Sequence, residues 1–204
     1  IHDFHTLTSR GVIAHFDSSS YERHIWFARI GDGSLGGKAR GLAFLNNLVY
    51  KHRLSEQYPN IKVSIPRTVV IATDYFDQFI LENDLQYVID SEISDDEVLS
   101  EFVSSRLPED LVDQLRVFIE TARSPLAVRS SSKLEDSSYQ PFAGVYSTYM
   151  IPLVENKDQM LRMLEKAIKS VYASVFYNGS RTYIQTTANL LSEEKMAVVI
   201  QSIC

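Results

Sequence analysis

Apolar residues along the chain recur at helical spacing in some stretches and form short continuous runs in others. Apolar positions three and four residues apart share one face of a helix, whereas short β-branched runs are typical of buried strands. Helices are predicted over residues 38–54, 74–81, 94–105, 108–119 and 161–175. Strands are predicted over residues 26–30, 68–73, 126–129 and 144–151, and from residue 196 onward. The last helix either ends near residue 175 or continues, with a break at residues 178–179, to about residue 190. This alternation indicates an α/β (α+β) chain.

Residue types that favour helix starts mark three of these helices. Ser94 and Glu97 fit a capping box, in which each side chain bonds the backbone N–H of the other residue. Asp74 is the expected N-cap of its helix. Pro108 is expected in the first turn of the next helix, because its missing N–H would have no partner there.

Length and composition predict one globular domain, or one domain with a smaller lobe. The chain has 204 residues, of which 45% are hydrophobic and 23% are charged. These values exclude collagen-like and largely disordered chains. The net charge of −6, without any basic block, argues against a general binder of nucleic acid or anionic membranes.

Cysteine usage indicates a cellular compartment, whereas histidine usage does not indicate a metal site. A single cysteine, Cys204, cannot form an internal disulfide, so a reducing, cytoplasmic location is expected. All five histidines lie within the first 52 residues and show no metal-ligand spacing. No apolar run approaches the roughly 20 residues that a membrane helix needs.

Both ends of the sequence predict that it is a piece of a longer protein. It starts at Ile1 without an initiator methionine, and it stops at Cys204 inside the apolar run that begins at Met196. Natural domains rarely end in mid-strand. The alternative is a processed chain that ends in an edge strand.

A first glycine cluster occupies residues 31–38. It satisfies the Gly-x-Gly-x-x-Gly dinucleotide pattern, but the preceding strand contains Arg29 and the nearest acid at the expected offset, Glu56, lies in a polar loop. With the dinucleotide pattern set aside, the cluster still contains two glycines, Gly36 and Gly37, followed by Lys38 at a helix start. Backbone N–H groups and a lysine at a helix N-terminus favour an anion. A turn followed by an ordinary surface lysine is the alternative.

A second cluster runs from Arg129 to Thr148. Arg129 ends an apolar strand, Ser130 opens a hydroxyl-rich loop, and Gly144 follows further on. Guanidinium, hydroxyl and backbone amide groups suit phosphate oxygens. An ordinary polar hairpin is the alternative, and the loop acids at 135–136 are either Mg²⁺ ligands or a solvated pair.

Three segments together resemble the phosphoenolpyruvate synthase / pyruvate phosphate dikinase family. The segment 34–43 resembles the Gly-Gly-Lys motif that opens the nucleotide-binding domain of that family. Residues 126–148 resemble its second signature, and residues 196–202 resemble the strand that reaches the adenine. The three occur in the family's order, from about residue 27 to the C-terminus.

The resemblance implies an ATP-grasp fold, in which ATP lies between two lobes. Residues 27–204 would be the N-terminal part of this domain, and residues 1–26 an N-terminal extension or linker. By matching motif, Lys38 and Arg129 would contact ATP phosphates as the catalytic pair. The nucleotide-binding set implied in full is Gly36, Gly37, Lys38, Arg129, Ser130, Gly144, Thr148 and Gln201, with Gly144 in the phosphate-covering loop and Gln201 at the adenine hinge.

The family passes phosphate from ATP to a histidine on a separate domain, and then to pyruvate or another acceptor. The resemblance therefore implies ATP and Mg²⁺ as cofactors, and downstream phosphohistidine and pyruvate-type domains as partners within the same longer protein. It places the metal ligands beyond residue 204, so the excised chain is expected to be inactive alone. Two alternatives stay open: a non-catalytic nucleotide-sensing or scaffold domain of a regulatory protein, and a dinucleotide-dependent oxidoreductase.

Overall fold

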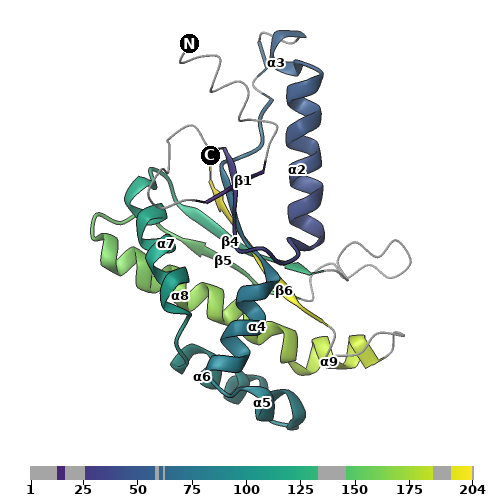
Figure 1. Ribbon diagram of the computed structural model, residues 1–204, viewed down its shortest axis with the longest axis vertical. Helices are drawn as coiled ribbons and strands as arrows, with labels where there is room; N and C mark the ends of the chain where they lie inside the picture. Colours follow the sequence, from purple (N-terminus) through teal and green to yellow (C-terminus); the bar gives the residue numbers. More distant parts are fainter. Residues whose placement is uncertain are drawn as a thin grey trace.

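A six-stranded mixed sheet forms the centre of the molecule, with the strand order β1-β2-β3-β6-β4-β5 (Figure 1). The computed structural model describes residues 13–16, 26–57, 60–61, 63–132, 146–185 and 194–203. The strands are β1 (Ala14–His15), β2 (Phe27–Ile30), β3 (Thr68–Ile71), β4 (Leu126–Ser132), β5 (Thr148–Ile151) and β6 (Met196–Ser202). Strands β1 to β3 are parallel to one another, and all other neighbours are antiparallel. The last strand in the sequence, β6, therefore lies in the middle of the sheet between β3 and β4.

The helices cover the two faces of this sheet unequally. They are α2 (Gly36–Lys51), α3 (Leu54–Gln57), α4 (Thr73–Glu82), α5 (Gln86–Asp90), α6 (Asp95–Ser104), α7 (Glu109–Thr121), α8 (Lys157–Ala173), η2 (Ser174–Phe176, a 3₁₀ turn) and α9 (Asn178–Gln185). One face packs against α4, α6, α7 and α8, whereas α2 stands apart from them against the other face (Figure 1). No helix within the described ranges is long and apolar enough to span a bilayer.

Because side chains alternate along a strand, the central strands supply two separate cores. In β6, Val198 and Ile200 join the large core under the helical layer, while Ala197 and Val199 join a smaller core under α2. All four are fully buried. Burial on both faces explains why β3 and β6 have continuous apolar runs instead of alternating ones.

Aromatic side chains fill the large core between α4, α6 and α8. Their ring centroids lie 5.1 to 6.1 Å apart, in edge-on, tilted and stacked arrangements. The rings belong to Phe76, Phe79, Phe102, Tyr172 and Phe176. Such pairs stabilise a fold beyond the area that they bury.

The predicted α/β class is confirmed, and so is the start of α6. The Ser94 hydroxyl accepts a bond from the Glu97 N–H at 3.3 Å, and the Ser94 N–H donates to the Glu97 carboxylate at 2.9 Å. The capping box therefore forms as the sequence predicts.

Two other helix starts differ from the prediction. Helix α4 begins at Thr73 with Ala72 as its N-cap, so Asp74 lies in the first turn and does not cap it. The Asp74 carboxylate is used elsewhere, since it accepts a bond from the N–H of Asp32 at 2.7 Å. Helix α7 begins at Glu109, and Pro108 is its N-cap residue instead of a member of the first turn.

Several predicted bounds shift by a few residues. The first helix starts at Gly36 and ends at Lys51, because the chain takes a positive φ of 47° at Arg53 before α3. The predicted strand 126–129 extends to Ser132, whereas the predicted strand 144–151 begins only at Thr148, and residues 144–145 lie outside the described ranges. The predicted break at residues 178–179 is the start of α9. Residues 186–190 of the predicted continuation also lie outside the described ranges. The sequence did not predict β1, α3 or α5.

Candidate functional site

The start of α2 lies directly on the backbone of β4. Gly36 has a φ of 69°, and a Cβ placed on it would come within 1.8 Å of the Ser131 carbonyl oxygen. Only glycine fits at such an approach. The first glycine cluster is therefore packed against the second cluster, which follows it by some ninety residues in the sequence.

Lys38 reaches across this contact. It lies in the first turn of α2, half-buried, and its Nζ donates a hydrogen bond to the Ser130 hydroxyl at 3.1 Å. The first turn of α2 contains no acidic residue. A helix N-terminus that carries a lysine and no acid favours a bound anion, because the peptide dipoles give this end a partial positive charge.

Arg129 lies one residue before Ser130 on β4, and its side chain is hydrogen-bonded to β6, a neighbouring strand of the sheet. Its guanidinium donates to the Gln201 side-chain oxygen at 3.2 Å. The amide nitrogen of Gln201 in turn donates to the Thr68 hydroxyl at 3.2 Å. The chain of contacts crosses β4, β6 and β3, whose register places Gln201 directly opposite Thr68. The Arg129 side chain is half-buried, so one cation is held in a fixed place on the sheet.

The remaining members of the implied nucleotide-binding set are placed as follows. Gly37 is buried in the first turn of α2. Thr148 is exposed and pairs with Arg129 across β4 and β5. Gly144 lies outside the described residues, as do the loop acids at 135–136. The structure therefore places Lys38 in contact with Ser130. On the same strand, Arg129 contacts Gln201 of β6 and is paired with Thr148 of β5.

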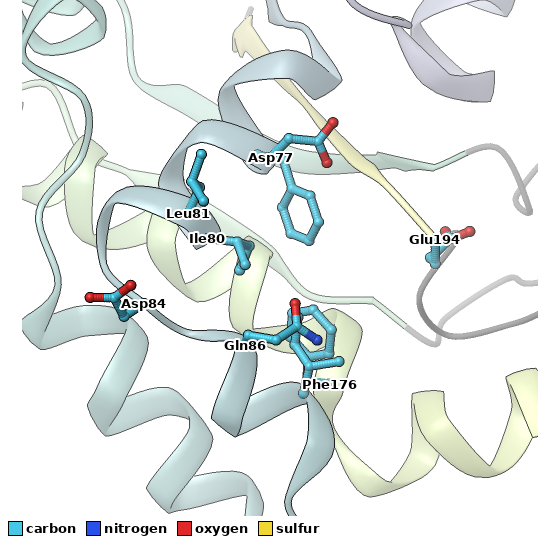
Figure 2. Close-up of a pocket in the computed structure, with 9 residues that line it drawn as sticks. Asp77, Ile80, Leu81, Asp84, Gln86, Phe176 and Glu194 are labelled. Atoms are coloured by element: carbon cyan, nitrogen blue, oxygen red, sulfur yellow. The ribbon is translucent and has the colours of Figure 1, made fainter.

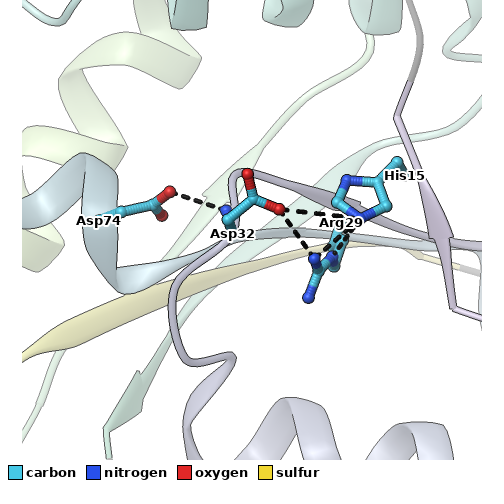
Figure 3. A network of polar contacts seen from close by, with 4 residues as sticks. All are labelled: His15, Arg29, Asp32 and Asp74. Carbon is cyan, nitrogen blue, oxygen red and sulfur yellow. Dashed lines mark hydrogen bonds and ion pairs between the residues drawn. The ribbon is translucent and has the colours of Figure 1, made fainter.

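The glycine loop before α2 is fastened to the start of α4, which sequence reasoning missed (Figure 3). Gly31 has a φ of 90°, and a Cβ on it would lie 2.5 Å from a carboxylate oxygen of Asp74. The Ser34 N–H donates to the Thr73 hydroxyl at 3.0 Å, and the Thr73 N–H donates to the Ser34 carbonyl at 3.0 Å. Gly31 thus serves close packing against α4. The available signal is an acid directly after the predicted strand 68–73, a position that also fits an N-cap.

Arg29, a second cation near this loop, forms an ion pair with Asp32. Arg29 on β2 contacts the Asp32 carboxylate at 2.9 Å and the His15 ring at 2.8 Å (Figure 3). Arg29 thereby fixes the exposed Asp32 turn. Lys38, in contrast, contacts β4 through the Ser130 hydroxyl.

A cavity of about 280 Å³ lies elsewhere, beside α4, α5 and η2 (Figure 2). Phe76, Ile80 and Phe176 are among the apolar residues that line it, and Asp77 and Glu194 are among the acidic ones. It lies among residues of the helical layer, not at the α2–β4 junction, and its carboxylates would repel a phosphate. The cavity is therefore not part of the candidate nucleotide site.

Within the described ranges, no group of three or more histidine, cysteine, aspartate or glutamate side chains is arranged to hold a metal ion.

Comparisons with known proteins show the family to which the chain belongs. An uncharacterized phosphotransferase of Bacillus subtilis (strain 168), YvkC, is 30% identical over 139 residues. The matched region is 68% of this chain but only 16% of that protein, so the chain spans a small part of its relative's length. Residues 32–204 match the model of the pyruvate phosphate dikinase AMP/ATP-binding domain, a range that contains Lys38, the second cluster and β6. The chain therefore belongs to the pyruvate phosphate dikinase AMP/ATP-binding domain family.

Proposed function

We propose that this chain is the ATP-binding part of a dikinase-type phosphotransferase, which passes phosphate from ATP to a histidine on another domain. The observation that carries the proposal is the hydrogen bond between Lys38 and Ser130. It joins the Gly-Gly-Lys motif to the residue that follows Arg129, and this supports a shared site for the two cations of the motifs.

The chemistry of this junction fits the phosphates of ATP. Lys38 and Arg129 carry positive charge, and Ser130 and Thr148 carry hydroxyl donors. Arginine and lysine bind phosphate through charge-assisted hydrogen bonds, which are stronger than neutral ones. Gln201, which holds the Arg129 guanidinium, connects this region to the strand that we propose reaches the adenine.

Phosphoryl transfer requires positioning and charge neutralisation more than covalent help from the protein. A nitrogen of the acceptor histidine attacks the phosphorus, and the bond from that phosphorus to the bridging oxygen breaks. The electron pair stays with the leaving oxygen. Lys38 and Arg129 would hold the phosphate chain in line and offset the charge on its oxygens as this bond breaks.

The proposal includes parts that lie outside the described residues. Gly144 would cover the phosphates, and the Mg²⁺ ligands would follow residue 204. Residues 27–204 would form the N-terminal part of an ATP-grasp domain, with residues 1–26 as an extension or linker. The phosphohistidine and pyruvate-type domains would belong to the same cytoplasmic protein.

Calorimetric titration of Mg-ATP into the natural protein in its full length tests the binding step. Lys38→Ala and Arg129→Ala are each expected to weaken binding by well over tenfold, because removing one partner of a buried charge contact costs about 2–5 kcal/mol. Lys51→Ala is the matched control, since Lys51 lies in the last turn of the same helix and is exposed. Equal affinities for Lys38→Ala and Lys51→Ala would contradict the assignment.

Labelling with ATP that carries radioactive phosphate tests the transfer step. Acid-labile, base-stable label on the wild-type protein, absent from Lys38→Ala, is the expected result for a phosphohistidine intermediate. Tight ATP binding without any label would instead favour the nucleotide-sensing or scaffold function.

A further inference from the structure

The hydroxyl of Ser131, on β4, joins two backbone groups in the first turn of α2. It donates to the Leu35 carbonyl at 2.8 Å and accepts from the Ala39 N–H at 3.0 Å. Ser131 is fully buried. An α-helix joins the same two groups directly, because the N–H of each residue bonds the carbonyl four residues earlier.

Other helices of the molecule show the direct bond at this position. In each, the fourth helical N–H donates to the carbonyl of the N-cap residue at an ordinary distance. The pairs are Val98 to Ser94 at 2.9 Å, Val112 to Pro108 at 3.1 Å and Met160 to Asn156 at 3.1 Å. In α2 the side chain of a distant strand takes both ends of this bond.

The backbone of Ser131 also contacts this turn. Its carbonyl oxygen occupies the space that a Cβ of Gly36 would fill. Side chain and main chain of Ser131 therefore both contact the first turn of α2. Lys38 is the residue before Ala39, and Arg129 and Ser130 are the residues before Ser131, so this contact sets the spacing between the two cations.

We propose that Ser131 is a positioning residue for nucleotide binding: its hydroxyl fixes the first turn of α2, and with it Lys38, against the strand that carries Arg129. This inference rests on the proposed function. Without the hydroxyl, the Ala39 N–H can bond the Leu35 carbonyl directly, so no backbone group is left without a partner. The helix is then retained, but its first turn is free to move relative to β4.

The test compares Ser131→Ala with Ser132→Ala in the full-length natural protein. Ser132 is the matched control because it is the next residue of β4, equally buried, and on the opposite face of the strand. Ser131→Ala is expected to weaken Mg-ATP binding by about tenfold, a typical coupling between contacting residues. Ser132→Ala is expected to change it less than twofold, with similar melting temperatures for both variants.

Two further measurements separate positioning from a merely structural role. Amide hydrogen exchange at Ala39 should remain slow in Ser131→Ala, because the direct helical bond replaces the bridge. In a Lys38→Ala background, titrated at millimolar ATP, Ser131→Ala should cause no further loss of affinity, since the residue it positions is gone. A structural defect would instead expose the amide, lower the melting temperature and weaken binding equally in both backgrounds.

The possible outcomes distinguish this inference from the function on which it rests. If the folded wild-type protein does not bind Mg-ATP, the proposed function and the inference are both wrong. If Lys38→Ala weakens binding while Ser131→Ala behaves like Ser132→Ala, the function stands and the inference is wrong.

Discussion

Gly36 decides how closely α2 can lie on the sheet. Its positive φ of 69° and the 1.8 Å approach of a Cβ to the Ser131 oxygen both exclude a larger residue. Gly36→Ala is expected to lower the free energy of unfolding by at least about 2 kcal/mol, from left-handed backbone strain and from the clash. Unfolding by urea measures this loss.

Gly41 in the same helix provides the opposite control. A Cβ on Gly41 meets no atom within 4 Å. Because glycine inside a helix is destabilising relative to alanine, Gly41→Ala should raise the free energy of unfolding by about 0.5–1 kcal/mol. Equal changes in the two variants would mean that the close contact between α2 and β4 is absent in solution.

At the scale of elements, α6 shows how a helix start depends on pH. Hydrogen bonds from the hydroxyl and the backbone of Ser94 lower the pKa of Glu97 below its ordinary value of 4.5. A carboxyl whose pKa is lower in the folded than in the unfolded state stabilises the fold above the unfolded pKa, and loses this effect as the pH falls through the folded one.

Ser94→Ala is therefore expected to destabilise the protein by about 1 kcal/mol at pH 7, the usual cost of losing an N-cap. The loss should be smaller at pH 3 than at pH 7, because a larger fraction of Glu97 is protonated at the lower pH and a protonated carboxyl accepts less strongly. Urea unfolding of both proteins at the two pH values measures the difference. A loss that is the same at pH 3 and pH 7 would show that the Glu97 carboxylate contributes nothing to the cap.

Elements with local signals could be predicted from the sequence, and elements fixed by distant contacts could not. The capping box of α6 lies within four residues, so the sequence contains all of it. The start of α4 has no such local signal, because its N-cap, Ala72, has no polar side chain. The first turn is instead held by hydrogen bonds between Thr73 and Ser34. Strand β1 has only two residues, too few for any periodicity.

The same distinction applies to the candidate site. Lys38 and Arg129 are recognisable because each lies in a short motif, next to glycines or at the end of an apolar strand. Ser131 is one of three consecutive serines, and nothing in that run marks it. Its role depends on the packing of α2 on β4, which joins residues 92 positions apart.

At the scale of the whole molecule, the sheet lies between the large aromatic core and α2, the helix that carries Lys38. The aromatic core lies on the face covered by α4, α6 and α8. The contacts of Lys38 and Arg129 lie at the junction of α2 with β4 and β6. Changes on the helical face should therefore alter stability without altering the nucleotide site, because mutations at distant sites without shared partners act independently.

Tyr172 offers the sharpest test of this separation. It is fully buried in α8, and its hydroxyl has no hydrogen-bond partner within the part of the chain that the structure describes. Burial raises the pKa of this phenol, so it stays neutral and its O–H is a desolvated polar group. Tyr172→Phe removes that group and keeps the ring contacts with Phe76 and Phe79, and should raise the free energy of unfolding by about 1 kcal/mol.

The affinity of Tyr172→Phe for Mg-ATP should equal that of the wild-type protein, whereas Lys38→Ala should keep the stability and lose the affinity. Phe79→Ala is the control for the core, with an expected loss of about 3–5 kcal/mol. Urea unfolding and calorimetry on the same four proteins measure both quantities. Lower stability in Tyr172→Phe would reveal a partner for the hydroxyl. A change in its ATP affinity would show that the two faces of the sheet are coupled through the strands that contribute side chains to both cores.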